Sequence, residues 1–205
     1  MAKKITTKSV HEQYKSYLKD WKDCTRCPLH CTRTQTVHFR GVLPCEVLFI
    51  GEAPGEVEDA LGQPFIGPAG KILDALINEL EGRLLISPTK IPKWGICNVL
   101  ACLPAKLEPN ELTGIDQVVG FREPSKEEVA QCLPRLERLI KLSGATKLIL
   151  LGKVAAKWTY TAIVHQTGIN VLEVWHPSYI LRKGGIHSGE FTKTLLQIER
   201  FLTQN

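Results

Sequence analysis

The stretch EVLFIGEAPG at 46–55 decides the fold, because it joins a short apolar run directly to a glycine-rich loop. An apolar run of this length that ends in glycine predicts a strand buried on both of its faces. GICNVL at 95–100 and KLILLG at 147–152 repeat the form, and VLEVW at 171–175 predicts a fourth strand. These runs together predict the strands of one sheet.

Stretches with the apolar spacing of helices lie between these runs. They are AGKILDALINEL at 69–80, KEEVAQCLPRLERLIKL at 126–142 and KVAAKWTYTAIV at 153–164, with further helices predicted at 11–19 and 189–202. Because strand and helix alternate, we predict an α/β protein with a parallel sheet. Ser125 and Glu128 predict a capping box at the start of the 126–142 helix, and Pro134 predicts a kink or a break inside it.

The length and composition are those of one globular domain, which we expect to span residues 1–205. No apolar run approaches the roughly 18 residues that a membrane span needs, and the first residues lack the apolar core of a secretory signal. We therefore expect an intracellular, cytoplasmic protein with no membrane partner, and we expect a monomer. The net charge of +5 favours a polyanionic partner without identifying one.

The segment LPAKLEPNELTGIDQVVGFREP at 103–124 shows no clear periodicity and contains three prolines. These properties predict an irregular surface insertion. We expect it to shape the mouth of a ligand crevice.

Polar residues follow the predicted strands where they end. Glu52 comes directly after the first strand, Asn98 stands near the end of the second and His176 follows the fourth. Open parallel sheets bind ligands beyond these carboxyl ends, so we expect a site here. Glu52 disfavours a nucleoside triphosphate, because phosphate oxygens need donors at its position, and no soluble nucleotide cofactor is expected. Glu52, Glu58 and Asp59 could orient a water or bind a metal, although the spacing favours a solvated helix start for the last two.

The segment HPSYILR at 176–182 allows two interpretations. Pro177 fixes the backbone beside His176, which could aim the imidazole into a cleft, although a lone histidine is more often structural. Arg182 could contact a phosphate. The bulky residues at 179–181 could wedge into a base stack or pack in the core.

The seven cysteines of an intracellular chain favour core, metal-binding or reactive thiols over disulfides. Cys24 and Cys27 form a CxxC pair, and Cys102 and Cys132 could complete a site of four thiolates, with Cys31 as a competing ligand. The alternative is a set of buried apolar thiols. Cys45 and Cys97, which adjoin or enter predicted strands, are assigned to the core.

Four motifs in order resemble those of the family 4 uracil-DNA glycosylases, the iron–sulfur branch of that superfamily. They are GEAPGEVED at 51–59, GQPFIGPAG at 62–70, NVLAC at 98–102 and HPSYILR at 176–182. The likeness runs from about Cys24 to Arg182 and implies a three-layer α/β/α sandwich with a central four-stranded parallel sheet. It also implies a DNA repair enzyme that flips uracil, or a related modified base, out of DNA and hydrolyses its N-glycosidic bond, leaving an abasic site.

The resemblance also implies roles for single residues. Phe65 would stack on the base, Asn98 would read its edge and His176 would donate a hydrogen bond to the departing base. Glu52 and Glu58 would position the attacking water or stabilise the cationic sugar. The remaining members of the implied site are Gly51 and Ala53 in the base pocket and Ser178, Tyr179 and Arg182 on the DNA.

Cys24, Cys27, Cys102 and Cys132 occupy the places of the family's ligands to a [4Fe-4S] cluster, with zinc as the alternative. The chain departs from the family beside this site. Leu103, Pro104 and Ala105 follow Cys102, where the family has an arginine and two prolines, and Pro68 replaces a basic residue. These departures leave a second hypothesis open, a catalytically altered iron–sulfur module that binds nucleic acid in a replication or repair assembly.

Overall fold

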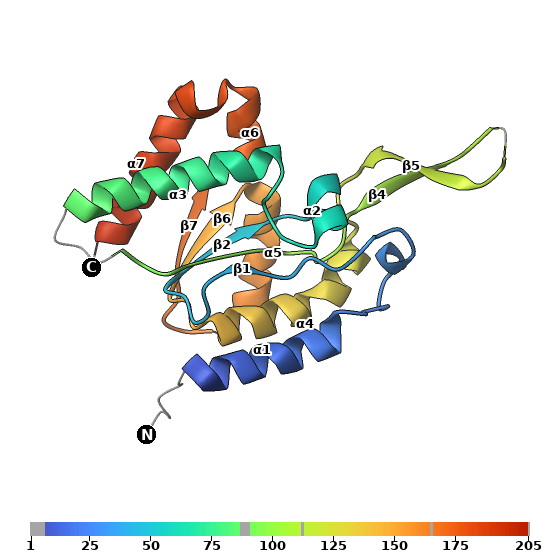
Figure 1. The fold of residues 1–205 in the computed structure, drawn as a ribbon, viewed down its shortest axis with the longest axis horizontal. Helices are drawn as coiled ribbons and strands as arrows, with labels where there is room; N and C mark the ends of the chain where they lie inside the picture. The colour runs from blue at the N-terminus through green and yellow to red at the C-terminus, as the bar shows by residue number, and fades with distance from the viewer. Residues whose placement is uncertain (1–6, 87–90, 112, 165, 205) are drawn as a thin grey trace.

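The protein is described by a computed structural model that covers residues 7–86, 91–111, 113–164 and 166–204 (Figure 1). Its centre is a sheet with strand order β1-β3-β2-β6-β7. Four of these strands are parallel, as predicted: β2 (Val47–Gly51), β3 (Trp94–Asn98), β6 (Lys147–Leu151) and β7 (Asn170–Val174). The prediction of a four-stranded sheet missed β1 (Arg40–Gly41), which pairs antiparallel with β3. Two residues are too few to show a pattern in the sequence.

Helices cover both faces of the sheet (Figure 1). One layer contains α3 (Pro68–Ile86), α6 (Pro177–Arg182) and α7 (Gly189–Thr203), and the other contains α1 (Thr7–Trp21), α4 (Lys126–Ser143) and α5 (Lys153–Ile163). The predicted three-layer α/β/α sandwich is therefore confirmed.

The strands alternate between these two layers. Leu48 and Ile50 of β2 pack into the core that contains α4, whereas Val47 and Phe49 pack into the core that contains α3. Successive side chains of a strand point to opposite faces, so a sheet covered on both sides needs apolar residues at every position. This is the physical reason for the unbroken apolar runs.

Helix α4 begins with the predicted capping box. Ser125 Oγ accepts the backbone N–H of Glu128 at 3.2 Å, and the Glu128 carboxylate accepts the N–H of Ser125 at 2.8 Å. The helix continues from Lys126 to Ser143 through Pro134, so the predicted break is wrong. Proline removes one N–H donor, and this helix tolerates that loss within its length.

The segment 103–124 is not the irregular insertion that was predicted. It contains an antiparallel ribbon of β4 (Ala105–Pro109) and β5 (Asp116–Phe121), which projects from the body (Figure 1). Almost every residue of both strands is exposed. A ribbon that buries neither face needs no alternation of apolar and polar residues, so its sequence carries no strand signal.

The remaining elements are short, and the sequence predicted none of them beyond a helix start at Glu58 and Asp59. They are α2 (Glu56–Leu61) and the 3-10 turns η1 (Pro28–Cys31) and η2 (Gly185–His187). None of the helices in the described ranges combines the length and the apolar character that a bilayer-spanning segment requires.

Candidate functional site

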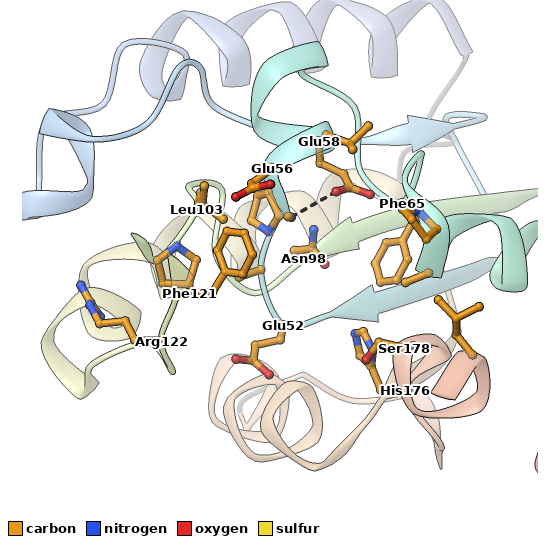
Figure 2. A pocket seen from close by; sticks show the side chains of 18 residues that line it. Glu52, Glu56, Glu58, Phe65, Asn98, Leu103, Phe121, Arg122, His176 and Ser178 are labelled. Atoms are coloured by element: carbon orange, nitrogen blue, oxygen red, sulfur yellow. Dashed lines mark hydrogen bonds between the residues drawn. The ribbon is translucent and has the colours of Figure 1, made fainter. Parts of the chain in front are cut away.

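A cavity of about 510 Å³ opens at the carboxyl ends of the parallel strands, where the sequence predicted a site (Figure 2). Phe65, Asn98 and His176 all line it, although they come from three distant parts of the chain. The cavity thus brings together an aromatic ring, an amide and an imidazole.

Phe65 is held in a backbone conformation that side chains rarely adopt. Its φ is 55°, in the left-handed region, and its side chain is buried. Its ring centroid lies 5.9 Å from that of His176. Two glycines leave the room that the ring and the backbone of Phe65 occupy. A Cβ would lie 2.4 Å from Phe65 Cζ if added at Gly51 and 1.9 Å from the Phe65 carbonyl oxygen if added at Gly70.

Asn98 presents an acceptor that the protein does not use. The residue is 1% exposed, and its Oδ1 has no hydrogen-bond partner among the described residues. A buried amide oxygen without a partner destabilises a fold by about 1–3 kcal/mol, and a ligand N–H donor would remove that cost. Gly51 makes the room for this oxygen, because a Cβ there would lie 2.4 Å from it.

His176 is oriented by Ser178. The residue is the N-cap of α6 and has an extended backbone, which is one of the two conformations, extended or turn, that Pro177 predicts for the residue before it. Its Nδ1 accepts the backbone N–H of Ser178 at 3.1 Å and lies 2.8 Å from Ser178 Oγ. Because a backbone N–H can only donate, Nδ1 is unprotonated and the neutral ring carries its proton on Nε2.

The charge state of His176 follows from its surroundings. Burial, and then the nearby Arg182 guanidinium, lower the pKa of the imidazole to about 4. At neutral pH the ring is therefore an uncharged Nε2–H donor beside the cavity.

Glu58 and Asp59 lie in the first turn of α2, so the predicted helix start is confirmed, but the prediction that they are solvated is wrong. Both residues are buried, at 7% and 5% exposure. Asp59 Oδ2 accepts the backbone N–H of Thr34 at 2.8 Å. These buried carboxylates accept hydrogen bonds from backbone N–H groups in neighbouring loops. The spacing of residues in the sequence does not show that these loops pack against the helix.

Glu58 joins the two loops that surround the cavity. Its carboxylate accepts the backbone N–H groups of Gly55 at 3.2 Å, Ile66 at 3.1 Å and Gly67 at 2.8 Å. The first donor belongs to the GEAPG loop, and the other two directly follow Phe65. Glu58 therefore lines the cavity but uses its oxygens to fix the backbone around Phe65.

Glu52 lines the cavity at the end of β2, and Ala53 lies beside it (Figure 2). The Glu52 side chain is partly buried. Burial, and then the charge of Glu123, raise the pKa of its carboxyl. Of the two glutamates assigned to catalysis, Glu52 is the one that lines the cavity while its carboxylate accepts no backbone N–H from any residue that the structure describes.

The root of the ribbon forms part of the cavity wall, so the expectation that 103–124 shapes its mouth is confirmed. Leu103 and Pro104, which directly precede β4, line the cavity on one side of the root, and Phe121 of β5 and Arg122, which follows β5, line it on the other. Sequence reasoning missed Phe121 and Arg122 as site residues. Pairing across the ribbon brings these residues to the cavity, because the Arg122 backbone N–H donates to the Pro104 carbonyl at 3.1 Å. Nothing in the sequence indicates this pairing.

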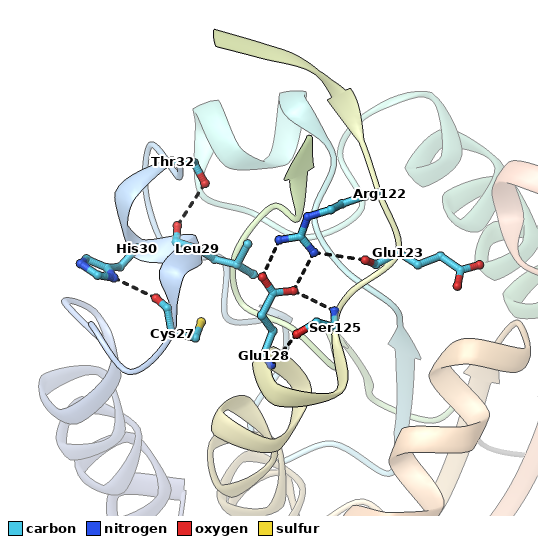
Figure 3. Close-up of polar contacts among 8 residues, drawn as sticks. All are labelled: Cys27, Leu29, His30, Thr32, Arg122, Glu123, Ser125 and Glu128. Atoms are coloured by element: carbon cyan, nitrogen blue, oxygen red, sulfur yellow. Dashed lines mark hydrogen bonds and ion pairs between the residues drawn. The ribbon is translucent and has the colours of Figure 1, made fainter. Parts of the chain in front are cut away.

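Arg122 fixes this root to α4. Its guanidinium contacts both carboxylate oxygens of Glu128, at 2.5 and 2.8 Å (Figure 3). The hydrogen bond from Arg122 holds the pKa of the Glu128 carboxyl below its usual value. Such a two-point contact orients the base of the ribbon as well as neutralising the buried charge.

The three residues assigned to DNA contact lie differently. Ser178 lines the cavity, whereas Tyr179 and Arg182 lie outside it. The Tyr179 ring packs at a tilt against the exposed Trp175, with 4.8 Å between ring centroids. Arg182 is exposed on α6.

The two apolar neighbours in this segment separate in the same way. Ile180 is fully buried and belongs to the core, whereas Leu181 is 40% exposed at the edge of the cavity. Only Leu181 is available to contact a nucleic acid.

The four cysteines of the predicted metal site line one small cavity between α1, α4 and the end of β3. They are Cys24, Cys27, Cys102 and Cys132. Burial raises the pKa of the Cys102 thiol to about 11, against the opposing effect of the hydrogen bond from Arg33. Two guanidinium groups donate to sulfurs of these cysteines, Arg33 to Cys102 Sγ at 3.4 Å and Arg135 to Cys132 Sγ at 3.3 Å.

This donor set fits a soft metal cluster, because four thiols and two cationic donors converge on it. Within the described ranges, however, no three His, Cys, Asp or Glu side chains stand close enough to share one metal ion. Cys31 is exposed outside this cavity, beside His30. Cys45 and Cys97 are buried in the core, as predicted.

Residues 40–198 match the family model of the uracil DNA glycosylase superfamily. The chain is 33% identical to the type-4 uracil-DNA glycosylase of Thermotoga maritima over 188 residues, which cover 86% of this chain and 85% of that protein. It is 30% identical to the type-4 uracil-DNA glycosylase of Pyrobaculum aerophilum, over 88% and 93% of the two chains. The crystal structure of Pedobacter heparinus SMUG2 shares the fold, with a TM-score of 0.61 at 11% identity over 95% of this chain and 99% of that one.

The contacts of Glu58 predict its contribution to stability. Glu58→Gln replaces one acceptor oxygen by an NH₂ group that faces backbone donors, so the free energy of unfolding should fall by roughly 1–3 kcal/mol. Urea unfolding measures this change. Glu56→Gln, an exposed change in the same helix, should stay within about 0.5 kcal/mol of the wild type. Equal urea midpoints of unfolding for the two variants would contradict the role of Glu58 in holding the two loops together.

The lowered pKa of His176 predicts how stability depends on pH. Between its usual pKa of 6.5 and about 4, the unfolded chain binds a proton that the folded chain does not. Stability should therefore fall as the pH drops through this window, and His176→Gln should lose less stability over the same range. Urea unfolding at several pH values measures both slopes. His38, whose pKa burial lowers to about 3, contributes the slope that remains in the variant. Identical slopes would show that His176 is not held neutral.

Proposed function

Because the chain belongs to the uracil-DNA glycosylase superfamily, we propose that it is a DNA repair glycosylase that releases uracil, or a related deaminated base, from DNA and leaves an abasic site. The observation that carries the proposal is the unpartnered Oδ1 of Asn98, buried in a cavity that Phe65 and His176 also line. Such a cavity is complementary to a flat ligand that carries an N–H donor on its edge.

The target base must leave the helix to reach this cavity, because its glycosidic bond is inaccessible inside the stack. A volume of about 510 Å³ accommodates one flipped nucleotide. The ring of Phe65 offers an aromatic face on which the base stacks.

Asn98 supplies the selection for uracil. Uracil carries an N–H at N3, which would donate to Oδ1, and a carbonyl at C4, which would accept from the Asn98 amide. Cytosine has an acceptor at N3 and a donor at C4, so it would leave both groups mismatched. Burying the Asn98 amide against mismatched groups of cytosine is strongly disfavoured. An Oδ1 that stays unpartnered in the free protein therefore allows the site to distinguish uracil from cytosine.

His176 assists departure of the base. Cleavage of the glycosidic bond leaves negative charge on the uracil ring, and the neutral Nε2–H of His176 would donate to its O2 as that charge develops. Ser178 holds the ring in the tautomer that this step requires. A neutral donor stabilises the anion without having to give up its proton.

Glu52 acts on the sugar side of the bond. Its carboxylate would orient the attacking water or offset the positive charge that develops on the sugar. Glu58 supports this chemistry indirectly, by holding the GEAPG loop and the Phe65 loop together.

DNA would contact the surface around α6. Ser178 and Leu181 lie at the cavity edge, with the Tyr179 ring and the Arg182 guanidinium beside them. The cation would contact a phosphate and the apolar side chain would fill the gap left by the flipped base. We expect a monomer in the cytoplasm to suffice for this reaction.

We further propose that Cys24, Cys27, Cys102 and Cys132 hold a [4Fe-4S] cluster. A single zinc ion needs its thiolates at about 2.3 Å, and no three donors in the described chain stand close enough for one ion. A cluster spans a wider set of thiolates, which suits four sulfurs around one cavity. When bound, the cluster would fix α4, the segment after β3 and the chain after α1 to one another.

The glycosylase proposal predicts uracil release. A single-stranded or duplex oligonucleotide with one uracil should be cleaved by alkali after incubation with the enzyme. Asn98→Ala and His176→Ala should each lower the rate by roughly 100- to 1000-fold, because each removes a donor or acceptor used in the reaction. Asn170→Ala, at the opposite end of the sheet, and His11→Ala, exposed on α1, serve as matched controls. Wild-type protein that binds the oligonucleotide but releases no base would instead support the catalytically altered binding module.

The cluster proposal predicts iron and sulfide in anaerobically purified protein, with the broad visible absorbance of an iron–sulfur cluster. Cys102→Ser should lower the iron content per chain, because it removes one thiolate ligand. Cys31→Ser, an exposed thiol outside the cavity, should keep the wild-type content. Elemental analysis that finds zinc, or equal iron in both variants, would contradict this assignment.

A further inference from the structure

Arg135 is a fully buried cation that lies between the four-cysteine cavity and the base pocket. It belongs to α4, is 1% exposed and lines the cysteine cavity. Among the residues that the structure describes, no carboxylate forms an ion pair with it. A buried guanidinium without an anion is strongly destabilising, so its charge requires another partner.

The cysteine site is the source of negative charge that Arg135 contacts. Its Nε donates to Cys132 Sγ at 3.3 Å. Thiols offer little to a guanidinium, whereas thiolates in a metal cluster carry negative charge and accept strong hydrogen bonds. The burial of Arg135 is thus explained if these sulfurs are thiolates.

The other edge of the guanidinium holds the end of β3. One Nη donates to the carbonyl oxygens of Asn98 at 2.5 Å and Val99 at 2.8 Å, and the other donates to the Tyr17 hydroxyl at 3.2 Å. Asn98 lines the base pocket, and it is the residue whose buried Oδ1 has no partner among the described residues. A single planar group therefore contacts both a cysteine ligand position and the backbone of the base-reading residue.

The Tyr17 contact makes this arrangement rigid. The Tyr17 hydroxyl lies 3.0 Å from His38 Nδ1, and both side chains are buried. Burial lowers the pKa of His38 to about 3, so the ring is neutral and shares one hydrogen bond with the Tyr17 hydroxyl. Arg135 thus has a fixed position, and a change at either edge must move or unpair it.

We infer that Arg135 is a positioning residue that ties the thiolate charge of the four-cysteine site to the placement of Asn98 in the base pocket. The inference rests on the proposed glycosylase function for its consequence in activity, and on the cluster proposal for its charge. It gives the cluster an effect on base recognition without any direct contact with the base.

The test compares Arg135→Gln with Arg138→Gln. Arg138 lies one turn further along α4, where it is partly exposed and pairs with Asp20 of α1, so its variant controls for loss of an arginine between the same two helices. Arg135→Lys keeps the charge, but its single ammonium cannot donate to Cys132 and Asn98 in the fork geometry of a guanidinium. It replaces Arg135→Gln if the latter does not fold.

A double-mutant cycle separates positioning from general stability. Arg135→Gln should lower kcat/KM for uracil release roughly tenfold in the wild-type background and less than about twofold in the Asn98→Ala background, because the lost effect passes through Asn98. Arg138→Gln should have the same small effect in both backgrounds. Penalties of Arg135→Gln and Asn98→Ala that multiply would overturn the inference.

Hydrogen exchange gives a second readout that needs no activity. Removal of the cluster with a chelator should speed exchange of the amides at 96–101 in wild type and Arg138→Gln, while α7 at 189–203 stays protected. In Arg135→Gln the same amides should exchange fast before and after removal. This response in a wild type that releases no uracil would reject the proposed function and keep the coupling. Exchange at 96–101 that ignores cluster removal, or a chain purified without iron, would overturn the coupling itself.

Discussion

The register of β2 against β3 is the constraint on which the site depends. It places Gly51 opposite Asn98 at the carboxyl edge of the sheet. Because Gly51 has no side chain, the Asn98 amide and the Phe65 ring can both occupy the space that a Cβ would take. A shift of one residue would put Ile50 there and fill the pocket with an apolar side chain. The sheet therefore determines the site before any loop contributes to it.

The three side chains that would contact the base, Phe65, His176 and Asn98, are each held in place by a different neighbouring residue. Glu58 fixes the loop of Phe65, Ser178 fixes the ring of His176, and Arg135 fixes the backbone of Asn98. These contacts use backbone donors and acceptors, which hardly move once the fold is formed. The pocket is consequently organised before a base enters it, and binding energy is not spent on ordering it.

What the sequence could predict follows from what each segment buries. The four parallel strands were predictable because both of their faces are covered, which demands continuous apolar runs. The pocket residues Asn98 and His176 were placed correctly because they follow strands that end at one edge. The ribbon at 105–121 was missed because it buries neither face. The roles of Glu58 and Arg135 were invisible because Glu58 bonds backbone N–H groups and one Nη of Arg135 bonds backbone carbonyls, and main-chain groups leave no trace in residue type.

The ribbon is joined to the body at two neighbouring points, Pro104 and Arg122, which are hydrogen-bonded to each other. Beyond that junction, none of the ribbon residues that the structure describes belongs to either core. A change in its length or composition therefore alters the rim of the pocket while the sheet, the helices and the cysteine cavity keep their own contacts. In such an architecture, evolution can change which damaged bases enter the pocket without changing the residues that act on the glycosidic bond.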